Sequence, residues 1–127
     1  MATKNLTIPV SLRTARDEIA YSKHKKHGQS VPLHQESAIK DWKYWKLIDN
    51  SFPYTVAFQL HHMLVPKRPV TAEELTNSEK AEMASILEEL SDEYDCHLVN
   101  FPKKQSNRGH YHIHLLQYKE LREELEL

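Results

Sequence analysis

The chain contains little of what disulfide-linked, membrane-spanning or phosphate-loop proteins need. Its single cysteine, Cys96, cannot form an intrachain disulfide, and no Cys-x-x-Cys pair is present to bind zinc. Two glycines are too few for a glycine-rich phosphate loop of the Walker or Rossmann type. No segment approaches about 18 apolar residues, and the N-terminal residues lack the apolar core of a signal peptide. We therefore expect a cytoplasmic protein without membrane contact.

Neither sign of charge is in excess, which argues against a general nucleic-acid-binding protein. The 17 Lys and Arg residues are balanced by 18 Asp and Glu residues, so the formal net charge is −1. No stable nucleic-acid complex is expected from such a balance. Apolar residues make up 39% of the 127 residues, which is enough for one modest core and predicts one globular domain.

Hydrophobic periodicity predicts an α+β domain with a mostly antiparallel sheet. Apolar residues at helical spacing predict a main helix over residues 81–94, and Thr76 to Glu79 before it has the form of a capping box. A shorter helix is predicted over residues 11–26. Alternating or apolar runs predict strands over residues 42–48, 54–60 with an extension through 65, 96–101 and 110–118.

Three histidines alternate with apolar residues near the end of the chain. His110, His112 and His114 stand in the run Gly109-His110-Tyr111-His112-Ile113-His114-Leu115-Leu116. Because side chains of a strand alternate between its faces, we expect the three imidazoles on one face, about 6–7 Å apart, and the intervening residues in the core. Three titratable rings on one face are costly unless that face performs chemistry or binds a charged ligand.

Imidazole is suited to phosphoryl transfer that needs no metal or other cofactor. One ring nitrogen attacks phosphorus when an acceptor holds the N–H of the other nitrogen, and neighbouring histidines donate to phosphate oxygens or protonate the leaving group. Such N–H donors stabilise the strongly anionic transition state more than the ground state. Of the adjacent residues His61 and His62, only one is expected to face this site. Further candidates for sugar or phosphate contacts at strand ends and in the loop before the triad are Asn50, Asn100, Gln105, Ser106, Asn107 and Arg108.

Two segments resemble the histidine triad (HIT) family of nucleotide hydrolases and transferases. The run from His110 to Leu116 fits the pattern His-φ-His-φ-His-φ-φ, in which φ is hydrophobic. The segment from His61 to Arg68 resembles the family's His-x-Leu-Val-Ile-Pro-Lys-Arg segment, and residues 50–54 resemble its turn at the ribose. The triad together with the upstream Pro-Lys segment is a specific combination, and the similarity extends over residues 42–118.

The resemblance implies a fold and a division of the chain. The implied HIT-like fold is a five-stranded antiparallel sheet with one main helix and a peripheral N-terminal helix, usually paired into a homodimer. The HIT-like domain would span residues 42–127. Residues 1–41 match nothing in the family and would form an N-terminal extension of unknown role.

The resemblance also implies an activity and a role for each site residue. A nucleotide would be cleaved at its α-phosphate, as in a phosphoramidate or a dinucleoside polyphosphate, through a nucleotidyl-histidine intermediate. His112 would be the nucleophile, and His110 and His114 would bind and polarise the phosphate or assist the leaving group. His61 would support the histidine network. The other implied nucleotide-binding residues are Asn50, which would meet the ribose, and Asn100, Ser106 and Asn107.

Two other functions stay open. Leu60 stands where the family has a glycine, and the loop before the triad lacks the usual Gly-Gln-Ser or Gly-Gln-Thr run, which motivates a non-catalytic nucleotide-binding or partner-binding module. Because His-x-His pairs on strands also bind zinc or iron, a histidine-ligated metalloprotein is the third hypothesis. The basic cluster over residues 23–27 is either solvated surface or a phosphate-facing arm. The remaining histidines are interpreted as surface or structural residues: His24, His27, His34 and His97.

Overall fold

The computed structural model describes residues 10–26, 32–105 and 109–120. Within them, five strands form one antiparallel sheet in the order β1-β2-β3-β5-β4. The strands are β1 (Ala38–Asp41), β2 (Trp45–Asp49), β3 (Phe58–Pro66), β4 (Cys96–Leu98) and β5 (Ile113–Tyr118). The helices are α1 (Ala15–Lys26) and α2 (Asn77–Glu89), with short 3-10 helices η1 (Leu33–Gln35), η2 (Ala72–Glu74), η3 (Leu90–Asp92) and η4 (Pro102–Lys104).

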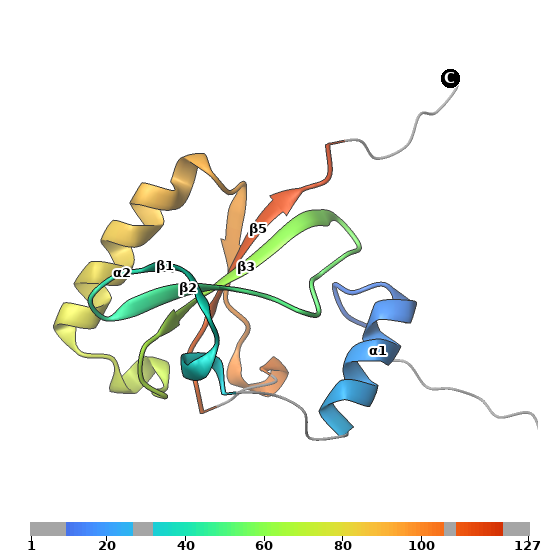
Figure 1. Ribbon diagram of the computed structural model, residues 1–127, viewed down its shortest axis with the longest axis horizontal. Helices are drawn as coiled ribbons and strands as arrows, with labels where there is room; N and C mark the ends of the chain where they lie inside the picture. Colours follow the sequence, from blue (N-terminus) through green and yellow to red (C-terminus); the bar gives the residue numbers. More distant parts are fainter. Residues whose placement is uncertain (1–9, 27–31, 106–108, 121–127) are drawn as a thin grey trace, which may run out of the picture.

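The two α-helices lie on different sides of the sheet. Figure 1 shows α2 running along one side, whereas α1 lies beyond the other side, next to the connection between β2 and β3. The predicted α+β class, with a five-stranded antiparallel sheet, one main helix and a peripheral N-terminal helix, is confirmed. No helix among the described residues combines the length and apolar character that a membrane crossing needs.

The face of the sheet toward α2 carries the main core. Leu47, Leu64 and Ile113 lie side by side across β2, β3 and β5, and each is at most 1% exposed. They pack in one cluster with Ile86 of α2 and with Leu90, which follows α2. Full burial of a side chain of this size contributes about 1.5–3 kcal/mol, so this cluster holds the helix on the sheet.

The opposite face combines an apolar patch with histidine. Ile48 of β2, Met63 of β3 and His114 of β5 form the next row across the sheet. Ile48 and Met63 also pack with Val65 and with Leu33 of η1. The chain segment before β1 therefore covers part of the face on which the histidine lies.

Helix α2 starts at Asn77, directly after the first residue of the predicted capping box, and ends at Glu89, whereas the predicted range was 81–94. Thr76 Oγ1 accepts the Glu79 N–H at 3.1 Å, and the Glu79 carboxylate accepts the Thr76 N–H at 2.8 Å. Arg68 donates to the same buried carboxylate at 2.7 and 3.0 Å and lowers the pKa of Glu79 to about 2. Trp45 Nε1 donates to the Glu79 carbonyl at 2.8 Å. The box thus ties the start of α2 to β2 and to the end of β3.

The connection between β2 and β3 is longer than predicted. The strand predicted to begin at Tyr54 begins only at Phe58. In the connection, the Val56 N–H donates to the Leu12 carbonyl at 3.1 Å instead of to a neighbouring strand. Because the segment before α1 takes up this hydrogen bond, residues 54–57 are held as a loop.

The other four strands also differ from the predictions. Strand β2 begins at Trp45 instead of residue 42 and ends at Asp49. Strand β1 was not predicted, because its four exposed residues show no apolar alternation. It lies within the first 41 residues, so part of the expected N-terminal extension belongs to the sheet. Strand β4 ends at Leu98 instead of residue 101, and Pro102 then begins η4. Strand β5 begins at Ile113 instead of residue 110, since the Tyr111 N–H donates to Val70 outside the sheet.

We expect Glu79→Gln to lower the free energy of unfolding by about 1–2 kcal/mol, because it removes the charge-assisted bonds with Arg68 and weakens the capping box. Thr76→Ala should cost about 1 kcal/mol. Urea denaturation followed by circular dichroism measures both. Lys80→Gln, an exposed change on the same helix, is the control and should stay within about 0.5 kcal/mol of the unmodified protein. Equal stability of the Glu79 and Lys80 variants would contradict the role of the box.

Candidate active site

Four histidines gather on the face of the sheet away from α2. His61 comes from β3, His114 from β5, and His110 and His112 from the segment that leads into β5. The ring centroids of His112 and His61 each lie 4.9 Å from that of His114, and all four side chains are buried. The residues between the triad histidines lie in or against the core under α2. The predicted separation of histidines and core residues onto two faces is confirmed.

His62 faces the other side of the sheet. Its Nδ1 lies 2.6 Å from the Tyr94 hydroxyl, and its Nε2 lies 3.8 Å from the Asp49 carboxylate. The prediction that only one residue of the pair His61 and His62 reaches the site is therefore confirmed, and His61 is that residue.

A backbone N–H fixes the tautomers of two of the clustered rings. Tyr54 N–H donates to His61 Nδ1 at 3.0 Å, so the ring hydrogen of neutral His61 is on Nε2. That nitrogen lies 2.7 Å from His114 Nδ1, which must accept, so His114 carries its hydrogen on Nε2. His114 Nε2 in turn lies 3.3 Å from the Tyr54 hydroxyl oxygen. This relay begins at the backbone of Tyr54 and ends at its side chain.

Two carbonyl oxygens fix the tautomers of the other two rings. His112 Nδ1 lies 2.9 Å from the His110 carbonyl, and His110 Nε2 lies 3.0 Å from the Pro66 carbonyl. Because a carbonyl can only accept, each of these nitrogens carries the hydrogen. His112 therefore keeps the lone pair on Nε2, and His110 keeps the lone pair on Nδ1. An imidazole with one N–H held and the other nitrogen unprotonated has the form that a nucleophile needs.

Burial keeps the histidines neutral. Desolvation lowers the pKa of His61 to about 3 and that of His114 to about 2. Desolvation also lowers the pKa values of His110 and His112, although each has a backbone hydrogen bond that acts in the opposite direction. Neutral rings are also what the relay requires, since His61 and His114 each donate through one nitrogen and accept through the other. At neutral pH the cluster thus offers the lone pairs of His110 Nδ1 and His112 Nε2, without an imidazolium charge.

The hydrogen bonds of the cluster bear on the metalloprotein hypothesis. Among the described residues, no group of three or more His, Cys, Asp or Glu side chains is arranged to hold a metal ion. His61 Nε2 and His114 Nδ1 share a hydrogen, so the lone pair of His114 Nδ1 is engaged by a neighbouring ring. The geometry favours a hydrogen-bonded histidine cluster over a metal centre.

Two of the four predicted nucleotide-binding residues lie at the cluster. Asn50 accepts the Phe52 N–H at 2.8 Å, and its Nδ2 lies 3.3 Å from His61 Nε2. Asn100 Nδ2 donates to the Tyr54 hydroxyl at 3.1 Å and lies 3.4 Å from His114 Nε2. Ser106 and Asn107 lie outside the described residues. The ribose and phosphate roles of all four stay predictions.

The structure adds three residues that sequence reasoning did not place here. Tyr54 was assigned to a strand, yet it lies at both ends of the relay. The Arg13 guanidinium is 5.1 Å from the centroid of the Tyr54 ring, and Arg13 Nε donates to the Phe52 carbonyl at 2.8 Å. His34 was interpreted as surface or structural, but its ring lies 5.7 Å from that of His110, and its buried Nδ1 has no hydrogen-bond partner among the described residues. The one available signal was that Tyr54 belongs to residues 50–54, the segment that resembles the family's turn at the ribose.

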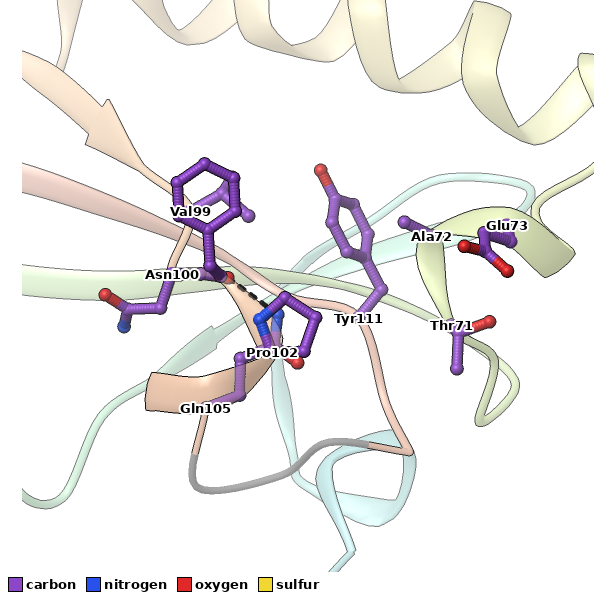
Figure 2. A pocket seen from close by; sticks show the side chains of 9 residues that line it. Thr71, Ala72, Glu73, Val99, Asn100, Pro102, Gln105 and Tyr111 are labelled. Carbon is purple, nitrogen blue, oxygen red and sulfur yellow. Dashed lines mark hydrogen bonds between the residues drawn. The ribbon is translucent and has the colours of Figure 1, made fainter.

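Two cavities are lined in part by η4, and they include residues that contact the cluster but none of its histidines. One has a volume of about 450 Å³, and Figure 2 shows Tyr111 between residues 71–73 and the residues around η4. The other has a volume of about 380 Å³ and is lined by residues before and within α1, by η4 and by Tyr54. The two cavities share Asn100 and Gln105. In Figure 2 the Asn100 side chain points away from Tyr111, which agrees with its contact with Tyr54 on the triad side.

Comparison with solved structures finds similar folds at low sequence identity. The chain is similar to HTC1, a crystal structure, with a TM-score of 0.51 and 19% identity over 84% of this chain and 75% of that chain. It also matches a HIT family hydrolase from Clostridium thermocellum with a TM-score of 0.49 and 17% identity, over 84% of this chain and 96% of that chain. No family model and no curated protein matches the chain. At such identity the similarity to HTC1 concerns the fold alone.

We expect the free energy of unfolding to rise with pH between about 3 and 6.5. In this window the unfolded chain binds protons at His61 and His114 that the folded chain does not bind, because their folded pKa values of about 3 and about 2 lie below the ordinary 6.5. Stability is therefore lost as the pH falls below 6.5. We expect a loss of about 2–4 kcal/mol between pH 7.5 and pH 5, measured by urea denaturation.

A matched variant isolates this contribution from that of the carboxylates. The double variant His61→Gln/His114→Gln keeps polar side chains but removes both titrating rings, so its unfolding free energy should change less between the same two pH values. An identical pH dependence in the two proteins would show that the buried pair does not cause the effect.

Proposed function

We propose that this protein is a nucleotide hydrolase or nucleotidyltransferase of the histidine triad type, acting at the α-phosphate. The observation that carries the proposal is the state of His112, whose Nδ1–H is held by the His110 carbonyl at 2.9 Å while its Nε2 keeps the lone pair. The resemblance of residues 61–68 and 110–116 to the family motifs supports the proposal. So does the five-stranded antiparallel sheet, which is the fold that the resemblance implies.

The reaction has two steps that pass through a nucleotidyl-His112 intermediate. First, the Nε2 lone pair attacks the α-phosphorus, and the leaving group departs with the electrons of its bond to phosphorus. The His110 carbonyl, still bonded to Nδ1–H, stabilises the positive charge that the ring gains. Second, a water oxygen attacks the phosphorus and releases a proton to solvent, while the electrons of the P–N bond return to Nε2. A different nucleophile in place of water gives transfer instead of hydrolysis.

The other residues position groups around this centre. The relay from Tyr54 through His61 keeps the hydrogen of His114 on Nε2, and the ring of His114 lies 4.9 Å from that of His112. These hydrogen bonds hold the His114 ring in place beside the proposed nucleophile. The proposed ribose and phosphate contacts are Asn50, Asn100, Ser106 and Asn107.

The test is His112→Asn, which keeps an amide N–H for the His110 carbonyl but lacks a nucleophilic nitrogen. We expect turnover of a fluorogenic nucleoside phosphoramidate and of a dinucleoside polyphosphate to fall at least about 10³-fold. Acid-quenched reactions with a labelled nucleotide should show a protein-bound label only when His112 is present. His97→Asn, an exposed change on β4, is the control. Undiminished turnover of the His112 variant would defeat the proposed mechanism.

The deep burial of the triad favours a second candidate, a non-catalytic nucleotide-binding or partner-binding module. His110 and His112 are each 6% exposed and His114 is 4% exposed, and none of them lines either of the two cavities. Calorimetry with a nucleoside monophosphate, combined with the turnover assays, separates the candidates. Tight binding without turnover favours the module, and rapid turnover excludes it.

We also propose the homodimer that the resemblance implies, formed along the edge of the sheet at β4. Val99 and Phe101, just beyond this edge strand, are 38% and 79% exposed. Sedimentation equilibrium should give about twice the 15.0 kDa mass of one chain, and Phe101→Glu should shift the protein toward a monomer. Ile39→Glu changes the opposite edge, β1, and should leave the dimer intact. A monomeric unmodified protein, or dissociation by the Ile39 change alone, would contradict this interface.

A further inference from the structure

The cavity of about 380 Å³ that borders Tyr54 is basic. Its lining comes from two parts of the chain that are far apart in sequence, the segment before and within α1 and the short helix η4. These parts contribute four cationic side chains, Arg13, Lys25, Lys103 and Lys104. Among the described residues that line it, Glu18 is the one acidic residue. We call this space the cationic cavity.

Glu18 compensates Arg13 and leaves the lysines unpaired. Its Oε2 lies 3.4 Å from Arg13 Nη1 and accepts the Ser11 hydroxyl at 2.7 Å. Within the described part of the chain, the three lysines of the cavity take part in no ion pair. Like charges around one cavity raise its potential and attract a ligand of opposite sign. The wall of the cavity therefore suits an anion with several charges.

Tyr54 and Asn100 connect the cationic cavity with the triad. Both residues line the cavity, and their polar atoms lie 3.3 and 3.4 Å from His114 Nε2. The His114 ring lies 4.9 Å from that of His112, so a group of several phosphates that starts at His112 would extend past Tyr54 and Asn100 to reach this cavity. The cavity in Figure 2 is different, because Glu73 is the one charged residue among those that line it. An anionic group therefore fits the cationic cavity and not the other.

The histidine cluster lacks an acid for a leaving group that needs a proton. His61 and His114 are neutral at physiological pH, and their N–H groups are used within the relay. An amine that leaves from phosphorus must be protonated as its bond breaks, whereas an oligophosphate leaves as a stable anion. Cations beside the bridging oxygen stabilise the charge that develops there in the transition state.

We propose that the cationic cavity binds an oligophosphate leaving group, so that the preferred substrate is a nucleotide whose α-phosphate carries further phosphate groups. This inference rests on the proposed function for the reaction itself. His112 Nε2 bonds to the α-phosphorus, and the bond from that phosphorus to the bridging oxygen breaks. The electron pair stays on the bridging oxygen, and the oligophosphate departs toward Arg13 and the three lysines. Phosphoramidates, whose leaving amine gains nothing from these cations, are the poorer substrates.

Binding of inorganic tripolyphosphate tests the cavity without any turnover. The variant Lys25→Gln/Lys103→Gln/Lys104→Gln removes the unpaired charges of the wall. The control Lys43→Gln/Lys80→Gln/Lys119→Gln changes the net charge equally at exposed lysines that line neither cavity. By calorimetry at low ionic strength we expect the cavity variant to bind about tenfold more weakly and the control within about twofold of the unmodified protein. Equal losses in the two variants would overturn the proposal.

Comparison of two substrates with different leaving groups tests the role of the cavity in the reaction. For a dinucleoside polyphosphate, kcat/KM of the cavity variant should fall about tenfold, with a clearly smaller loss for a nucleoside phosphoramidate. Equal reductions for the two substrates would overturn the proposal. If the unmodified protein cleaves neither substrate, the proposed function fails. Tripolyphosphate binding then still tests whether the cationic cavity binds an oligophosphate. A short oligonucleotide that binds more tightly than tripolyphosphate, and loses affinity in the cavity variant, would assign the cavity to nucleic acid and overturn the proposal.

Discussion

The hydrogen bond from the Tyr54 backbone N–H to His61 Nδ1 determines the tautomers of two rings of the histidine cluster, His61 and His114. A backbone N–H can only donate, so His61 Nδ1 must accept and the tautomer of this first ring of the relay is fixed. The hydrogen of His61 then fixes the tautomer of His114, whose own hydrogen returns to the Tyr54 hydroxyl. The position of the loop between β2 and β3 thus decides which nitrogen of His114 donates. His114 lies two residues after His112, the proposed nucleophile.

That loop is in turn held by residues before and within α1, a part of the chain to which the resemblance to the HIT family does not extend. Leu12 accepts the Val56 N–H, and Arg13 donates to the Phe52 carbonyl on the other side of Tyr54. The Thr55 hydroxyl donates to the Asp17 carboxylate at the start of α1. Residues 10–26 are therefore structurally part of the candidate site, since they fix the loop and also line the cationic cavity. Three residues of the predicted N-terminal extension, Leu12, Arg13 and Asp17, thus hold the loop that contacts the same cluster as the HIT-like motifs.

Local sequence patterns predicted the features that depend on alternation and capping, namely the faces of the strands and the start of α2. A period of two separates His112 and His114 from Ile113, and it also separates His61 from His62, so the faces of both strands could be assigned before the fold was known. The contacts of Tyr54 and His34 could not be assigned in this way. Tyr54 bonds to Asn100, 46 residues away, and the ring of His34 packs against that of His110. Such pairs follow from tertiary packing, and neither β1 nor these contacts has a periodic signal.

Burying four imidazoles is tolerable because each is neutral and each ring hydrogen has an acceptor, whereas a buried imidazolium would lose its hydration without a compensating carboxylate. The same neutrality limits what the cluster does by itself. Neutral rings whose hydrogens are already bonded within the protein do not balance the charge of a phosphate. Positive charge for an anionic ligand must come from outside the cluster, and in the described residues it lies next to it, on Arg13 and on the lysines of α1 and η4. Hydrogen-bond geometry and net charge are thus supplied by different elements: β3, β5 and the residues before β5 hold the histidine rings, whereas α1 and η4 carry the positive charge.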